Sequence, residues 1–179
     1  MKKILAVLSV LCIFLQAEAC SSDENLPLFS ETEIPSSLTA GTEKEVPDMQ
    51  LAYAAGGSTY TINVFPGNSS WLVDKGDGSS SATLRCGFHP LDAAGSIPEI
   101  KQAAGPEKIN ISFSLSPSSL SVRRWKDSCA GNAEKYDKAS EIVAADENTI
   151  IVTNDGTGYI YEVRAKWPQG EAQYAFYLK

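Results

Sequence analysis

The chain has 179 residues, of which 15 are Lys or Arg and 22 are Asp or Glu, so its formal net charge is −7. Such an acidic chain is unsuited to nucleic acid and to a peripheral grip on anionic lipid head groups, because both need an excess of basic side chains. It holds one histidine and no CxxC or Cys/His spacing, which argues against a zinc site and implies no cofactor.

The first nineteen residues have the three parts of a secretory signal peptide. These parts are a positive start at Lys2 and Lys3, an apolar run over residues 4–15, and a small-residue site at residues 17–19. The run is too short to cross a bilayer core of about 30 Å as a stable helix. We therefore expect export with cleavage before Cys20, and an uncleaved helical anchor is an alternative.

Cys20 is the expected lipidation site. A small residue directly before a Cys suits the bacterial lipoprotein pathway, in which a diacylglycerol group alkylates the thiol. Ala17 stands where such signals prefer Leu, and the acidic Glu18 is unusual, so plain secretion is the alternative. The mature protein is expected on the outer face of the cell membrane, held there by its lipid anchor only.

The remainder divides into a tether and a domain. Residues 20–47 are rich in Ser, Thr, Glu and Pro, and they bury too little apolar surface to offset the entropy of ordering. Residues 48–179 suffice for one hydrophobic core.

Cys86 and Cys129 lie in this domain. A cysteine pair in an exported domain first indicates a disulfide, and two separate buried thiols are the alternative.

Apolar and polar residues alternate along much of the domain, as in strands with one buried face and one wet face. The longest alternation runs from Tyr159 to Trp167, with Ile160, Glu162, Arg164 and Lys166 on the expected wet face. Further strands are expected near residues 51–54, 59–64, 71–74, 82–86, 109–115, 120–125, 149–153 and 174–178. The loops at residues 154–158 and 168–171 carry turn-forming residues and predict a meander at the end of the chain.

Eight or nine short strands at this spacing predict an all-β domain, a single immunoglobulin-like antiparallel β-sandwich. A closed barrel is the alternative. Residues 133–145 contain helix formers but a poor apolar stripe, so a short helix or an irregular loop is expected there.

Several short sequence motifs follow one another over residues 50–179. They are Ser70-Trp71, Gly76-Asp77-Gly78, HPLD at 89–92, Ile97-Pro98, FSLSPSSLSVRRW at 113–125, GYIYEV at 158–163 and YAFYL at 174–178. This order resembles a family of small, uncharacterised lipoproteins of Gram-positive bacteria, and similar segments follow the membrane part of some antibiotic-sensing regulators. The resemblance implies an exported β-sandwich and no established activity. Cys86 and Cys129 depart from the family pattern, which favours their pairing.

His89 is the only histidine, so any mechanism that needs an imidazole runs through it. Pro90 favours an extended backbone at His89, and Asp92 could cap the turn or accept a hydrogen bond from the ring. No serine lies in a GxSxG or SxxK motif. We therefore expect a structural turn at His89 and Asp92, no catalytic residues and no enzyme; a hydrolase that uses His89 is the less favoured alternative.

Arg123, Arg124 and Trp125 form a basic cluster in an acidic domain. If Leu120 and Val122 face the core, Trp125 shares the opposite face with Arg123. An exposed Trp beside Arg would be a binding hot spot for a protein, peptide or glycan at the cell surface. The alternative is that Trp125 turns inward while the arginines pair with acids.

Three aspartates, Asp74, Asp77 and Asp155, lie in Gly-rich loops that could offer oxygen atoms to Ca²⁺, but their spacing does not match an EF-hand loop. Ordinary turns explain them, and we expect no metal.

The sequence thus predicts a non-enzymatic extracytoplasmic lipoprotein, a binding or accessory module presented at the membrane surface. A structural or inhibitory surface protein is the alternative.

Overall fold

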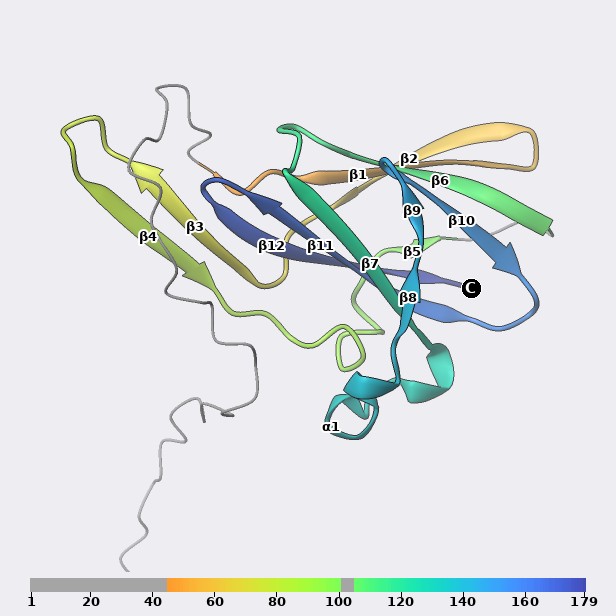
Figure 1. Ribbon diagram of the computed structural model, residues 1–179. Coiled ribbons are helices and arrows are strands. Elements are labelled where there is room, and N and C mark those ends of the chain that lie inside the picture. Colours follow the sequence, from red (N-terminus) through yellow and green to blue (C-terminus); the bar gives the residue numbers. More distant parts are fainter. Residues whose placement is uncertain (1–44, 101–104) are drawn as a thin grey trace, which may run out of the picture. The chain divides into compact units, whose positions relative to one another are not determined.

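The computed structural model describes residues 45–100 and 105–179, which form two antiparallel sheets packed against each other (Figure 1). The all-β sandwich is thereby confirmed, and its immunoglobulin-like character stays a prediction. The signal peptide, Cys20 and the tether up to residue 44 lie outside the described residues. The domain begins before the expected boundary at residue 48, because Pro47 is buried and its carbonyl accepts a hydrogen bond from the Tyr174 hydroxyl.

The first sheet has the strand order β2-β1-β6-β10-β9. Its strands are β1 (Met49–Ala55), β2 (Ser58–Val64), β6 (Gly105–Phe113), β9 (Ala145–Asp146) and β10 (Thr149–Asn154). The turn between β1 and β2 consists of Gly56 and Gly57, whose φ angles of +58° and +80° belong to the left-handed region that glycine tolerates. β2 forms one edge of this sheet.

The second sheet has the order β4-β3-β12-β11-β7-β8. Its strands are β3 (Ser69–Asp74), β4 (Ser80–Arg85), β7 (Ser119–Lys126), β8 (Glu141–Val143), β11 (Tyr159–Trp167) and β12 (Gly170–Leu178), and the short β5 (Glu99–Ile100) pairs in parallel with the end of β12. The expected terminal meander is wrong at its first loop. β10 belongs to the other sheet, so residues 154–158 cross between the sheets and only β11 and β12 form a hairpin.

The main core lies between the two sheets. β11 places Tyr161 and Val163 there, opposite Leu51 of β1, and all three are fully buried. Trp71 and Trp167 pack edge to face at 5.4 Å between ring centroids, and both are buried in this core. Burial of each large apolar side chain contributes about 1.5–3 kcal/mol, so these residues dominate the stability of the sandwich.

A second, smaller cluster lies on the outer face of the second sheet. Residues 89–98 and 127–140, which we call the outer layer, cover that face and bury Leu91, Trp125 and Ile160. The outer layer contains the 3-10 turns η1 (Asp127–Cys129) and η2 (Asp137–Ala139) and the four-residue helix α1 (Ala133–Tyr136), below β7 and β8 in Figure 1. The expected wet face of β11 is therefore wrong at Ile160 and Glu162, both of which are buried.

Candidate functional site

His89 lies in the outer layer and is held from both ring nitrogens. The Leu91 N–H donates to Nδ1 at 3.2 Å, so the ring proton sits on Nε2, which lies 3.0 Å from Asp137 Oδ1. The ring also packs edge to face on Trp125, with 5.3 Å between centroids. His89 thus joins its own turn to η2 and to β7, as a structural residue would.

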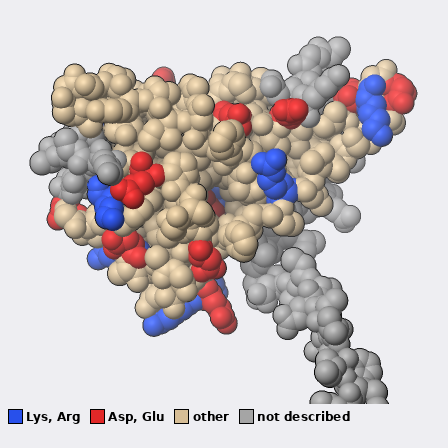
Figure 2. All heavy atoms as spheres, turned by 180° about the vertical axis from the view of Figure 1, so that it is seen from behind, with Lys and Arg blue, Asp and Glu red and all other residues tan. Residues whose placement is uncertain are grey.

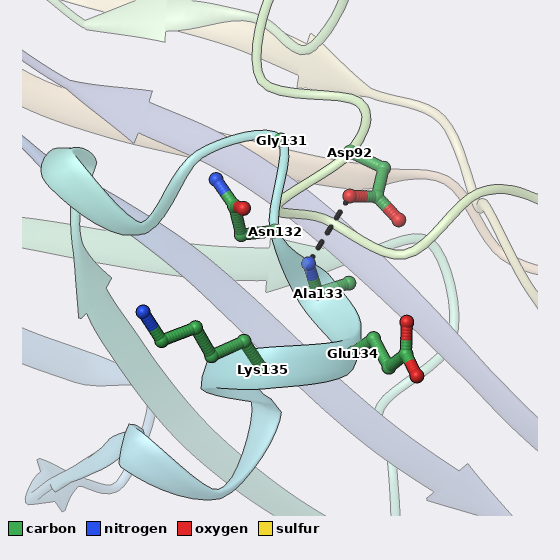
Figure 3. Close-up of a pocket in the computed structure, with 6 residues that line it drawn as sticks. All are labelled: Asp92, Gly131, Asn132, Ala133, Glu134 and Lys135. Carbon is green, nitrogen blue, oxygen red and sulfur yellow. Dashed lines mark hydrogen bonds between the residues drawn. The ribbon is translucent and has the colours of Figure 1, made fainter.

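Asp92 does not accept a hydrogen bond from His89. Its carboxylate accepts one from the Ala133 N–H at 3.2 Å and thereby caps α1 from a distant loop (Figure 3). The surrounding depression has a volume of about 480 Å³. In Figure 3 the side chains of Glu134 and Lys135 point to opposite sides, Glu134 to the right and Lys135 to the left.

Trp125 shares the outer face of β7 with Arg123, as the alternation predicts, but the exposed hot spot is wrong. Trp125 is 1% exposed, because the outer layer covers its ring. Its indole N–H donates to the carbonyl oxygens of Tyr136 and Asp137, each at 3.1 Å. Arg124 points to the other face, where its guanidinium lies 4.1 Å from the centroid of Tyr159. Trp125 and Arg123, which also binds Asp137, therefore hold the outer layer on the sheet.

Glu162 lies at the centre of a charge network under the outer layer. It is 1% exposed and accepts hydrogen bonds from Arg123 and from Arg164 Nε, the latter at 2.9 Å. Arg123 Nη1 also binds Asp137 Oδ1 at 3.0 Å. Burial raises the pKa of the Asp137 carboxyl, but the hydrogen bond from His89 and the charge of Arg123 outweigh it, so this pKa lies below its ordinary value.

Cys86 and Cys129 are both free thiols, so the expected disulfide is wrong. The two cysteines lie in different surroundings. Cys86 follows β4 and is exposed, whereas Cys129 ends η1 and packs against the Trp125 cluster of the outer layer. The alternative of two separate thiols holds, but the expected burial does not, because Cys86 is exposed and Cys129 is half-buried. The carboxylates of Asp74, Asp77 and Asp155 accept hydrogen bonds from N–H groups of their own turns, as expected.

The sequence did not indicate the most exposed aromatic side chains. Phe65 is 69% exposed and Phe88 is 82% exposed, and both line a groove of about 410 Å³. The other lining residues, all in the described part of the chain, are Pro66, Gly67, Arg85, Cys86, Gly87, Pro90, Ala93, Ser96, Ile97, Pro98 and Ala175, so Arg85 is the only charged one. We call this feature the Phe65–Phe88 groove.

The two loops that form the groove are held in a fixed position. Asn68 Oδ1 accepts a hydrogen bond from the Gly87 N–H at 2.6 Å, and the Gly67 N–H donates to the Gln173 carbonyl of β12 at 2.8 Å. The backbones of Gly67 and Gly87 approach so closely that a Cβ on Gly87 would lie 3.0 Å from the Gly67 carbonyl carbon. The missing side chain of Gly87 therefore permits the contact that brings both aromatic loops to one groove.

Comparisons of the chain with known protein families, with curated proteins and with solved structures give no match. Within residues 45–100 and 105–179, no cluster of three His, Cys, Asp or Glu side chains could hold a metal ion. In the same part of the chain, no helix has the length and apolar character needed to span a membrane.

Proposed function

We propose that this protein is an exported, lipid-anchored binding module without catalytic activity, and that the Phe65–Phe88 groove is its contact surface. The family resemblance of residues 50–179 and the signal peptide expected before Cys20 support export and lipid anchoring. The single observation that supports binding is the groove itself, with two exposed aromatic rings beside it. Exposed apolar patches on a domain are typical of interaction sites, and loops on a rigid scaffold often provide them.

The chemistry of the groove favours an apolar ligand. Its lining is rich in Phe, Pro, Ile and Ala, and the Arg85 guanidinium donates to the Pro66 carbonyl at 3.2 Å. Covering the two Phe rings would gain about 25 cal/mol for each Å² of apolar surface removed from water. Since the loops are already fixed, little ordering entropy opposes this gain. We infer that the ligand is an apolar segment of another protein at the membrane surface.

Site-specific photo-crosslinking tests this proposal in the producing cell. A photoreactive phenylalanine analogue replaces Phe88, or replaces Ile151, an exposed apolar residue of β10 outside the groove. We expect a discrete protein adduct from position 88 that disappears with Phe65→Ser, and none from position 151. Equal adducts from both positions would contradict the proposal that the groove is the contact surface. An adduct from position 88 that persists in the Phe65→Ser variant would contradict it as well.

A separate measurement tests the lipid anchor at Cys20. The mass of the mature N-terminus should show cleavage before Cys20 and a diacylglycerol-sized increment on that residue. An unmodified Cys20 in the culture medium would reject the lipid anchor while leaving the groove untouched.

A further inference from the structure

The edge strand β2 is open to a further strand. Among residues 45–100 and 105–179, only β1 pairs with it. Its sequence, STYTINV, has four β-branched residues and contains no charge, Pro or Gly. Natural sheets protect a long edge with Lys, Pro, a bulge or a cover, because unpaired N–H and C=O groups readily accept another strand. The sequence of β2 provides none of the residue-based devices.

The register of the β1–β2 hairpin shows which backbone groups face outward. Because the turn has two residues, the flanking Ala55 and Ser58 form the hydrogen-bonded pair that closes the hairpin. Hydrogen-bonded and non-hydrogen-bonded pairs then alternate along the ladder. The residues of β2 that direct their N–H and C=O groups away from β1 are therefore Thr59, Thr61 and Asn63.

The surroundings of this edge are uncharged. Residues 49–73 contain no Asp, Glu, Lys or Arg, although charged residues make up 21% of the chain. The hairpin lies at the upper left of Figure 2, in a part of the surface without red or blue side chains. On β2, Tyr60 stacks on Tyr53 at 5.5 Å and is still 47% exposed. An uncharged strand with a half-covered ring fits another uncharged strand.

We propose that two copies of the protein pair through β2, antiparallel, about a two-fold axis at Thr61. In this register Thr61 lies opposite its own counterpart, and Thr59 lies opposite Asn63 of the second copy. The outward-facing groups of both strands then form about six backbone hydrogen bonds. On the other face Tyr60 lies opposite Ile62 of the second copy, which covers its exposed ring.

A second copy is favoured over an unrelated strand because the edge is self-complementary. A two-fold interface needs the same patch on both partners, and the outward residues of β2 are polar, uncharged and symmetric about Thr61. The contact joins the two first sheets into one continuous sheet. Because it buries little more than one strand edge, we expect a reversible dimer with a Kd on the order of micromolar. The inference does not depend on the groove or on lipidation.

Sedimentation velocity tests the pairing. The protein used runs from residue 20, carries Cys20→Ser and is kept in reducing buffer, so that neither an acyl chain nor a disulfide links the copies. We expect a concentration-dependent monomer–dimer equilibrium. Thr61→Lys and Thr61→Glu, each alone, should weaken the dimer by about tenfold or more, because like charges then face each other across the axis.

Mixing the two charge variants is the decisive test of pairing through Thr61. An equimolar mixture of Thr61→Lys and Thr61→Glu proteins should restore the dimer, since only opposite charges then meet at the axis. The same substitutions at Ala82, an exposed residue of the other long edge strand β4, should leave dimerisation unchanged. A protein that stays monomeric at all concentrations, a dimer that ignores the Thr61 substitutions, or a mixture that fails to restore it would each overturn the proposal.

Discussion

His89 and Arg123 bind the same oxygen atom, because His89 Nε2 and Arg123 Nη1 each lie 3.0 Å from Asp137 Oδ1. One residue comes from the loop after β4 and the other from β7, and both pack against the Trp125 ring. Asp137 therefore connects the two segments of the outer layer to the sheet beneath them. The charge network therefore stabilises the attachment of the outer layer to the sheet.

Removing the buried acid should be costly. Glu162→Ala leaves Arg123 and Arg164 without the carboxylate that both bind, and loss of one partner of a buried ion pair costs about 3–5 kcal/mol. Glu141→Ala removes an exposed partner of Arg124 and should cost less than about 1 kcal/mol. Urea denaturation of both variants measures the difference, and equal losses would show that the outer layer does not shield Glu162.

Acid should weaken the domain partly through Asp137. Its pKa in the folded protein lies below the unfolded value of about 3.9, so its stabilising contribution is complete above that value and is lost as the pH falls through the folded pKa. Asp137→Asn should therefore be less stable than the natural protein at neutral pH, and the gap should narrow below about pH 4. Glu134→Gln, which removes the charge of an exposed acid on the neighbouring helix, is the matched control. A gap that stays constant down to pH 2 would contradict this account.

Alkali should weaken the domain through Tyr174. Burial, followed by the charge of Asp48, raises the pKa of Tyr174 well above its ordinary value. The unfolded tyrosine loses its proton first, so the stabilising contribution is complete below about pH 10 and declines above it, by at most about 1.4 kcal/mol per pH unit. Tyr174→Phe should reduce this decline in denaturation experiments above pH 10. Identical slopes for the two proteins would speak against the buried phenol.

Gly87→Ala should open the Phe65–Phe88 groove without unfolding the protein. The added Cβ would press on the Gly67 backbone at 3.0 Å, and the two loops would have to separate by a few tenths of an ångström. An apolar fluorescent dye that binds the groove should bind about tenfold more weakly, since a loosened site loses preorganisation. Gly95→Ala, which meets open space, is the matched control. Unchanged dye affinity in Gly87→Ala would show that the dye binds elsewhere.

Alternation along single strands was enough to predict the main sandwich. Tyr161, Val163 and Trp167 face the core because every second residue of β11 does, and that information is local. Ile160 and Glu162 could not be placed in this way. Their burial depends on the outer layer, whose segments are far away in the sequence and poor in large apolar residues. The partners of Glu162 also depend on the register between β7 and β11, which no single strand reveals.

The groove could have been suspected from the sequence. Phe65 stands before Pro66 and Gly67, and Phe88 stands after Gly87. Both aromatic residues therefore lie beside turn-forming residues and not within an alternating strand. An aromatic ring in a turn has no expected place in the core. What the sequence could not provide was the contact between the two turns, which depends on Asn68 and on β12.

The position of β12 has a consequence for when this domain can fold. The last strand of the chain is an interior strand of its sheet, and it lies between β3 and β11. Gly67 and Gln173, which share a hydrogen bond, stand at nearly opposite ends of the domain sequence. Contacts of such large sequence separation form slowly, because closing a long loop costs entropy before any pairing compensates it. The second sheet therefore stays incomplete until β12 has left the ribosome, and before that moment β3 and β11 each lack the strand that separates them in the folded sheet.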